Sequence, residues 1–305
     1  MKHILVVGSM NADLVIQTPR MPRMGETVRG SGFCVNTGGK GANQAAAIAK
    51  LGGDIKLLGC VGADSYGEML LSDLSRFGVQ TDGAQTVDTA TGVAVITVCG
   101  GDNCIILDAG ANACMTPEVI DANAALFAWA DYCVLQLEIP LETVLHAARA
   151  AKKNGAKVVL NPAPMCPLPE ELLALVALFV PNSSEAELFL GHPVEGIEGA
   201  KAAAAEIRAR GVPDVIITLG SDGCVYCGGG SVRHHGIVDT PVVDTTAAGD
   251  TFVASVLVCL TEGMSMAEAV RFATHASALC VSRSGAMASV PTRDEVEAFM
   301  ARSGK

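Results

Sequence analysis

Short runs of β-branched and other apolar residues alternate along this chain with Ala- and Leu-rich stretches typical of helices. The runs that predict strands are Ile4–Val7, Ile55–Leu58, Tyr132–Leu135, Val158–Leu160, Leu178–Val180 and Val215–Leu219. The stretches that predict helices are Ala42–Leu51, Tyr66–Phe77, Leu141–Lys153, Ser183–Leu190, Gly199–Arg210 and Thr251–Glu262. Because strands alternate with helices, the pattern predicts an α/β fold with a doubly wound, mostly parallel sheet and helices on both faces.

Two segments interrupt this alternation. Residues 14–33 are rich in Pro, Gly and Met, and show no helical period. Residues 91–107 predict a hairpin of Val93–Val98 and Cys104–Leu107. Neither segment can bury enough apolar surface alone, so we expect both to form a small antiparallel sheet, inserted as a lid over a site. The main domain then comprises residues 1–13, 34–90 and 108–305.

Composition narrows the class of protein. Of the 305 residues, 50% are apolar and 17% are charged, which predicts one large domain with a well-buried core. The net charge of −11 and the lack of a Lys or Arg block argue against a nucleic-acid partner. The 11 cysteines are scattered through mostly apolar runs, which is typical of free thiols in a reducing cytoplasm. Since no apolar segment approaches membrane-spanning length, we expect a cytoplasmic protein without membrane contact.

The segment 242–252 carries the most informative chemistry. It predicts an extended apolar run at Val242–Val243, a turn of small residues at Ala247–Gly249, and a helix that begins at Thr251. The small side chains of this turn leave its backbone N–H groups uncovered. The first N–H groups of the following helix also lack acceptors, so the turn can bind a phosphoryl group. Asp250 follows this turn, where a carboxylate makes a poor anion ligand but a good base toward a hydroxyl. The segment therefore predicts phosphoryl transfer to an alcohol.

Polar clusters follow the predicted strands. They are Asn11 with Asp13, Asn161–Pro164, Pro181–Asn182, Thr218–Gly223 and Asp250. In a doubly wound sheet, ligands bind beyond the carboxyl ends of the strands, so the clusters together predict a single crevice. Taken alone, Asn11 and Asp13 are equally typical of a strand-end turn, and Asn182 with Glu185 of a helix cap.

A second glycine cluster, Gly38–Gln44, opens the first predicted helix. Glycine by itself explains a tight loop-to-helix turn, but Lys40 and Asn43 in this turn can also hold sugar hydroxyls or a phosphate. Glu138, at the end of a buried run, is either a surface cap or part of the same site. The chain has no GxxxxGK[ST] loop and no GxGxxG after its first strand, which argues against P-loop and NAD-binding proteins.

Two motifs in this order carry a family resemblance. One is Gly39–Gln44 and the other is Asp244–Phe252, and the similarity runs from Gly8–Asp13 to Gly285–Pro291. The chain thus resembles the ribokinase family of carbohydrate kinases, also called the PfkB family. The segments that follow the pattern of its ribose-phosphorylating members are Asn11–Asp13, Ala109–Ala113 and Asn161–Pro164. The resemblance implies a ribokinase-like fold and transfer of the γ-phosphate of ATP to the 5-hydroxyl of D-ribose.

The resemblance also implies roles for individual residues. Around the sugar these are Asn11, Asp13, Gly39, Lys40, Gly41, Asn43 and Glu138, with Asp250 as the base that deprotonates the 5-hydroxyl. In the anion hole they are Gly249, Ala248 and Ala247. Around ATP they are Asn182, Glu185, Thr218, Gly220, Ser221, Gly223, Gly249 and Thr274, with Glu185 helping to place Mg²⁺ through water. A potassium site is implied at Asp244, at Ser289, and at the backbone carbonyls of Thr246, Cys280, Arg283 and Gly285.

One motif and one further position depart from the family pattern and leave the nucleotide preference open. Asn182–Glu185 keeps the ends of the usual Asn-Glu-Thr-Glu motif without its inner acid, and Thr274 stands where Asn or His is common near adenine. The alternatives are a kinase for 2-deoxyribose, a nucleoside or fructose, a non-catalytic sugar-binding protein, and a dehydrogenase, whose glycine fingerprint is missing. The resemblance and the exposed edge of the lid imply a homodimer that forms through the lid.

Overall fold

The computed structural model describes residues 2–100 and 102–303, and Gly101, in the turn of the predicted hairpin, lies outside them. In this part of the chain, eight strands form the main sheet in the order β14-β13-β12-β11-β10-β9-β1-β4. Their bounds in that order are Ser231–His235, Cys224–Gly228, Asp214–Thr218, Val176–Phe179, Lys157–Leu160, Tyr132–Leu135, His3–Val7 and Asp54–Leu58. All neighbours from β12 to β4 are parallel, which confirms the predicted sheet, and β13 and β14 add an antiparallel hairpin at one edge.

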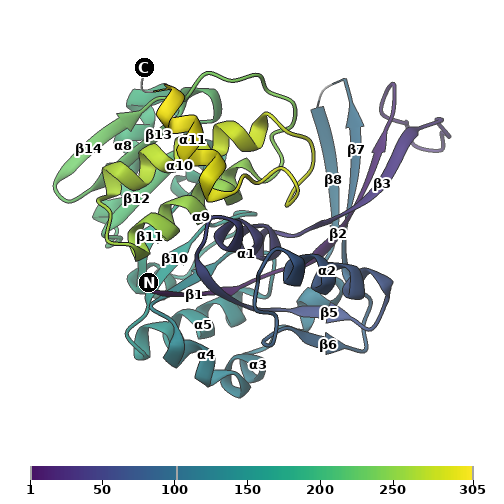
Figure 1. The fold of residues 1–305 in the computed structure, drawn as a ribbon, viewed down its shortest axis with the longest axis horizontal. Coiled ribbons are helices and arrows are strands. Elements are labelled where there is room, and N and C mark those ends of the chain that lie inside the picture. The colour runs from purple at the N-terminus through teal and green to yellow at the C-terminus, as the bar shows by residue number, and fades with distance from the viewer. Residues whose placement is uncertain (1, 101, 304–305) are drawn as a thin grey trace.

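Helices cover both faces of the main sheet, as the alternation predicts (Figure 1). They are α1 (Lys40–Lys50), α2 (Ser65–Arg76), α3 (Pro117–Ala122), α4 (Ala124–Trp129), α5 (Leu141–Lys153), α6 (Glu170–Leu175), α7 (Ser183–Leu190), α8 (Gly196–Ala209), α9 (Ala248–Thr261), α10 (Met266–Val281) and α11 (Arg293–Ser303), with 3₁₀ turns at Gly110–Cys114 and Gly220–Asp222. Side chains alternate along β1, so Ile4 and Val6 join a core with α1, α9 and α10, whereas Leu5 and Val7 join a core with α5 and α8. None of the helices in the described ranges has the length and apolar character needed to cross a membrane.

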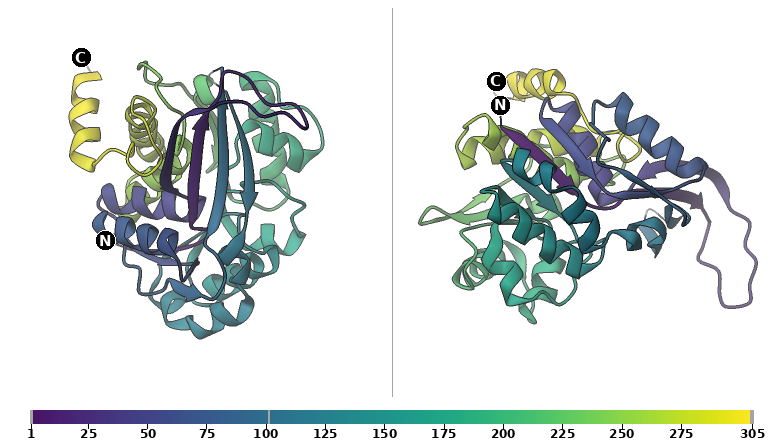
Figure 2. Two further views of the ribbon diagram at one scale, coloured as in Figure 1. Left: turned by 90° about the vertical axis from the view of Figure 1, so that its right-hand side faces the viewer. Right: turned by 90° about the horizontal axis from the view of Figure 1, so that it is seen from below.

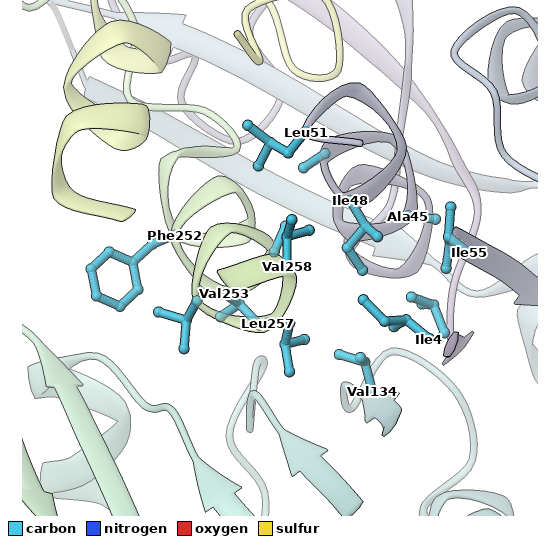
Figure 3. Packing of buried hydrophobic residues seen from close by; sticks show 14 of the residues in the cluster. Ile4, Ala45, Ile48, Leu51, Ile55, Val134, Phe252, Val253, Leu257 and Val258 are labelled. Carbon is cyan, nitrogen blue, oxygen red and sulfur yellow. The ribbon is translucent and has the colours of Figure 1, made fainter. Parts of the chain in front are cut away.

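The contact between α1 and α9 positions the candidate site. Figure 3 shows side chains of both helices gathered between them, with Ile48 on α1 and Val258 on α9, close to Ile4 and Val134 of the sheet. These four side chains are fully buried. Burying a side chain of this size contributes roughly 1.5–3 kcal/mol, so the two helices are held firmly together.

A second sheet projects from the body of the molecule (Figures 1 and 2). Its strands, in the order β3-β2-β7-β8, are Ser31–Gly38, Asn11–Gln17, Gly92–Cys99 and Asp102–Asp108. The predicted hairpin is the antiparallel pair β7 and β8. The segment that is predicted to join it forms a second antiparallel pair, β2 and β3, and the central strands β2 and β7 are parallel to each other. The pairing continues to Asn11 and Gly38, so the lid strands extend beyond the predicted segment 14–33. A short parallel pair, β5 (Cys60–Gly62) with β6 (Gln85–Val87), completes the strands of the described residues.

The prediction of an extended, strand-like run at Val242–Val243 is wrong. Both side chains are exposed, at 68% and 62%, and the segment is an irregular loop without a neighbouring strand. The N–H of Val243 donates to the carbonyl of Val281 at the end of α10 instead. The following helix, α9, begins at Ala248, three residues before the predicted Thr251, so Asp250 lies inside its first turn.

Candidate active site

Two cavities adjoin at the carboxyl ends of the parallel strands. The smaller, of about 200 Å³, is lined by Lys40, Asn161, Ala163, Val180, Asn182, Glu185, Thr218, Thr245, Ala247, Gly249, Asp250 and Val253. The larger, of about 500 Å³, shares Asn182, Thr218, Thr245 and Gly249 with it. Four of the five polar clusters at the predicted strand ends therefore meet in one place.

Asp250 is only 8% exposed, in the first turn of α9. Its Oδ2 accepts a hydrogen bond from Asn43 Nδ2 at 3.1 Å, and its Oδ1 accepts one from Gln44 Nε2 at 3.0 Å. Both donors come from the N-terminal half of α1, so two packed helices orient the carboxylate. Each carboxylate oxygen has further lone pairs that can accept a proton from a substrate hydroxyl.

The glycines of the second cluster allow α1 to start against the turn after β1. Gly39 has a φ of 89°, in the left-handed region that favours glycine, and a Cβ on Gly41 would lie 2.6 Å from the backbone of Gly8–Ser9. The N–H of Lys40, the first of the helix, donates to Glu138 Oε2 at 3.0 Å. Glu138 therefore caps α1, and direct sugar contacts of Gly39 and Gly41 stay predictions.

Asn11 and Asp13 begin β2, and the two-residue period places both side chains on one face. Asn11 Oδ1 accepts a hydrogen bond from Asn112 Nδ2 at 2.7 Å, and Asn11 Nδ2 lies 3.5 Å from Glu138 Oε2. Burial, followed by the carboxylates of Glu138 and Asp250, raises the pKa of Asp13 to about 7. The carboxyl groups of β2, α9 and the loop after β9 are thus close enough to affect one another and offer several acceptors to sugar hydroxyls.

Lys40 brings a positive charge to these carboxyl groups. Burial opposes this charge, but the carboxylates of Asp250, Glu138 and Glu185 outweigh burial and raise the pKa of Lys40. The side chain lines the smaller cavity, where a permanent ammonium attracts phosphate oxygens.

The small residues before Asp250 form an anion-binding turn. Ala247 has a φ of 61°, the one positive φ at a non-glycine residue in the described ranges. The N–H groups of Ala247, Gly249 and Asp250 have no acceptor among the described residues. The expectation of a bare N–H is wrong for Ala248, whose N–H donates to Thr245 O at 3.2 Å and closes the turn. A Cβ on Gly249 would meet no atom within 4 Å, so open space lies beside this turn.

Asn182 and Glu185 form a capping box at the start of α7. Asn182 Oδ1 accepts from the Glu185 N–H at 2.8 Å, and Glu185 Oε2 accepts from the Asn182 N–H at 2.8 Å. Burial raises the pKa of Glu185 against the opposing effects of the Asn182 N–H and Lys40. Both residues also line the smaller cavity, so the cap holds Glu185 at the position predicted to serve a cation.

The larger cavity collects the residues predicted around ATP. Its lining includes Asn182, Thr218, Gly220, Ser221, Gly223, Gly249 and Thr274, whereas Glu185 lines only the smaller cavity. Apolar walls come from Ile237, Val238, Val242, Phe252, Ala278 and Val281. The Thr274 hydroxyl donates to Val270 O at 2.9 Å within α10. The lining therefore suits a flat, apolar ring between small polar contacts.

The residues predicted for a potassium site also come together. Asp244 Oδ1 accepts from the Thr246 N–H at 2.9 Å, and Asp244 Oδ2 accepts from the Gly285 N–H at 3.0 Å. Although burial opposes its charge, the hydrogen bonds from Thr246 and Gly285 lower the pKa of Asp244. Cys280 Sγ lies 3.1 Å from Ser289 Oγ and 3.7 Å from Thr246 O.

The Arg283 guanidinium is paired with Glu295 at 2.8 Å, so this positive charge is neutralised beside the cluster. The cluster combines a carboxylate, backbone carbonyls and a hydroxyl, which are the hard oxygen donors that suit an alkali cation. No group of three or more His, Cys, Asp or Glu side chains in residues 2–100 and 102–303 is arranged to hold a metal by itself.

Three buried carboxamides of the site were not predicted. Gln44 donates a hydrogen bond to Asp250, and Asn112 donates one to Asn11. Gln136 in turn donates to Gln44. The sequence signal was a polar residue inside an apolar stretch, since Gln44 precedes three alanines and Gln136 stands between two leucines. A long amide side chain in such a stretch needs a buried partner.

Comparisons with known proteins extend over nearly the whole chain. The profile of the pfkB family of carbohydrate kinases matches residues 1–293. The ribokinase of Haemophilus influenzae is 40% identical over 301 residues, which cover 98% of each chain. The deoxyribokinase of Salmonella typhi is 34% identical over 300 residues, which cover 97% of this chain and 98% of the other.

A solved structure shows the same arrangement of elements. The structure of Arabidopsis thaliana ribokinase complexed with ribose and ATP matches with a TM-score of 0.92 and 37% identity, over 98% of each chain. The match covers the projecting sheet as well as the main sheet, because so little of either chain is left out.

Proposed function

Since this chain belongs to the pfkB family of carbohydrate kinases, we propose that it transfers the γ-phosphate of ATP to the 5-hydroxyl of D-ribose. One observation carries the proposal. Asp250 and the free N–H groups beside it lie where a small cavity, lined also by Lys40 and Glu185, adjoins a larger, mostly apolar one. Phosphate oxygens fit the first in chemistry and a nucleotide fits the second. Asn11 and Asp13 line neither cavity, but the charge of Asp250 acts on Asp13, so they offer polar groups to the hydroxyls of a sugar beside Asp250. A similar ribokinase was solved with both compounds bound.

Asp250 takes the proton from the sugar hydroxyl as the hydroxyl oxygen attacks the phosphorus. The negative charge of the transferred group faces the free N–H groups of Ala247 and Gly249 and the ammonium of Lys40. Asn11 and Asp13 hold the other sugar hydroxyls. Phosphoryl transfer depends on positioning and charge stabilisation, and these are the contributions that the described residues make.

Two cations belong to the proposal. Glu185 would help to place Mg²⁺ through water, and the ion would neutralise charge on the phosphates of ATP. The cluster around Asp244 and Ser289 fits K⁺ because its donors are oxygen atoms next to the anion-binding turn. Asp244, Thr246 and Ser289 would hold the cation there, and its charge would support the conformation of the turn that contains Ala247.

Replacement of the proposed base tests the function. Asp250→Asn keeps the size of the side chain but cannot accept the proton, so we expect kcat to fall about 10²–10⁴-fold while D-ribose still binds. The measurements are ADP release for kcat and calorimetry for ribose binding. Asp121→Asn, at a 71% exposed carboxylate, is the control. Near-normal turnover by Asp250→Asn would remove Asp250 from this role.

A 2-deoxyribose kinase is the second candidate, because the deoxyribokinase of Salmonella typhi is also similar over nearly the whole chain. ADP release from ATP with D-ribose, 2-deoxyribose, adenosine, pseudouridine and fructose, each with and without K⁺, separates the candidates. We expect the highest kcat/KM for D-ribose, and higher rates with K⁺. A preference for another acceptor would replace ribose in the proposal. Tight ribose binding without turnover would instead support a non-catalytic sugar-binding protein.

We also propose a homodimer that forms through the lid and resides in the cytoplasm. The lid exposes large apolar side chains, namely Phe33, Val95, Ile105, Ile106 and Leu107, at 41–71% of their surface. Apolar area of this extent on a projecting sheet favours a protein partner, here a second copy of the chain. The 11 cysteines are all free thiols, which supports a reducing compartment.

A further inference from the structure

The carboxylate of Asp250 is held by amides and not by an ion pair. Among the described residues, its side-chain partners are Asn43 and Gln44, with one hydrogen bond to each carboxylate oxygen. Lys40 acts on it only through its charge and does not donate to it. The position of Asp250 relative to α1 therefore depends on where these two amides point.

The amide of Gln44 is saturated by three partners. Its Nε2 donates one hydrogen to Asp250 Oδ1 and the other to Asn161 Oδ1, both at 3.0 Å. Its Oε1 accepts from Gln136 Nε2 at 2.6 Å. A flipped amide would turn Oε1 toward the carboxylate, which can only accept, so the orientation of Gln44 is determined.

Gln136 and Asn161 anchor this amide to the main sheet. Gln136 directly follows β9, Asn161 directly follows β10, and Asn161 Nδ2 donates to Val180 O, just after β11, at 2.8 Å. The relay of Gln136, Gln44 and Asp250 thus connects the carboxyl ends of adjacent strands with the first turn of α9.

The two buried glutamines lower the free energy of unfolding of the core, so a contribution to stability does not explain their presence. Gln44 and Gln136 are both 0% exposed, and Gln136 Oε1 has no hydrogen-bond partner in the described residues. Burial of an unpaired amide oxygen is unfavourable, and an apolar side chain of this size would avoid that penalty. Gly8 also leaves room for the amide, because a Cβ there would lie 2.0 Å from Gln136 Oε1.

We propose that Gln44 and Gln136 are positioning residues for phosphoryl transfer, which hold Asp250 Oδ1 so that the carboxylate faces the sugar hydroxyl. Gln44 acts directly on Asp250, and Gln136 acts only through Gln44. The inference rests on the proposed role of Asp250 as the base. It predicts that the two glutamines affect the chemical step and do not affect sugar binding.

Three variants test the relay: Gln44→Met, Gln136→Met and the double variant. Methionine keeps the length of the side chain and removes its hydrogen bonds. We expect kcat to fall about tenfold or more for Gln44→Met, and about threefold to tenfold for Gln136→Met, because small displacements of a reacting group are costly. KM and the calorimetric Kd for D-ribose should stay within about twofold. The double variant should match Gln44→Met alone, since coupled residues are not additive.

Gln80→Met, at an exposed glutamine that donates to Asp54, is the matched control and should leave kcat unchanged. Thermal unfolding of each variant shows whether it is folded. If Gln44→Met does not fold, kcat and KM of Gln136→Met test the proposal alone. Unchanged kcat, a rise in KM alone, or effects that multiply in the double variant would overturn the relay. If Asp250→Asn were fully active, the proposed base would fail, which is a different result from an inactive Asp250→Asn with normal glutamine variants.

Discussion

Asp13 illustrates how the surroundings of one carboxyl group oppose folding. It is 7% exposed, and burial together with Glu138 and Asp250 raises its pKa from 3.8 to about 7. Between these two values the native protein binds more protons than the unfolded chain. The contribution of Asp13 to the free energy of unfolding therefore falls as the pH rises through this range. A sugar hydroxyl that donates to the ionised carboxylate would compensate for the lost stability.

Asp13→Asn should separate stability from binding. Without ligand, we expect the melting temperature of the variant relative to the wild type to be higher by a few degrees at pH 8 than at pH 5, because only the wild type ionises. The affinity of the wild type for D-ribose should rise from pH 6 to pH 8, and the variant should lose this dependence. Scanning fluorimetry and calorimetry measure both effects. An equal loss of stability at both pH values would contradict the argument.

At the scale of elements, the site is a meeting of two helix N-termini. The start of α1 carries Lys40, Asn43 and Gln44, and the start of α9 carries Asp250 and the anion-binding turn. The positive ends of both helix dipoles therefore face the same space, which favours an anionic group there. Glycines serve the two helices differently, because Gly41 packs against backbone while Gly249 borders open space.

Replacement of glycine by alanine should therefore impair the protein for different reasons at these two positions. Gly41→Ala places a Cβ 2.6 Å from the backbone of Gly8–Ser9, so we expect lower thermal stability together with lower activity. Gly249→Ala meets no atom within 4 Å, so its melting temperature should stay near that of the wild type. Its methyl group enters the space of the transferred group, and kcat/KM should fall about 10²-fold.

Gly199→Ala, in α8, is the control for both glycine variants. Its Cβ would lie 3.3 Å from the backbone of Val194, a tight contact that the higher helix propensity of Ala offsets. Thermal unfolding and ADP release should be close to wild type. Normal activity of Gly249→Ala would show that no transferred group occupies the space beside the turn.

The whole molecule consists of a main body and a projecting sheet. The main sheet is covered on both faces, whereas the lid strands extend away from the body (Figures 1 and 2). Val95 and Ile106 are paired neighbours in the lid and share one face, 41% and 71% exposed. An isolated sheet of this kind gains most of its stability from a cover over its apolar face, for which we propose a second copy.

Charges on the lid should break this assembly. We expect the wild type to sediment as a dimer and the double variant Val95→Glu with Ile106→Lys to sediment as a monomer, because the interface would have to bury both charges. Leu188→Lys, at a 71% exposed leucine on α7 away from the lid, should leave the sedimentation unchanged. A monomeric wild type at micromolar concentration, or a dimeric double variant, would refute the lid interface.

Much of the fold could be predicted because its signals are local. The ranges predicted for Tyr132–Leu135, Leu141–Lys153 and Ser183–Leu190 coincide with β9, α5 and α7. The apolar run at Val242–Val243 misled the prediction, since strand character depends on a partner that these residues lack. The antiparallel hairpin of β13 and β14 at the sheet edge also went unpredicted.

By itself, the sequence determined the alternation of strands and helices, the motifs around Lys40 and Asp250, and the family, because these are encoded in neighbouring residues. Only the tertiary structure decided the partners of Asp250, since Gln44 lies 206 positions away along the chain. It also decided the pKa of Asp13 and the engaged N–H of Ala248. Hydrogen bonds and electrostatic effects depend on distances in space, and these are set when distant segments pack together.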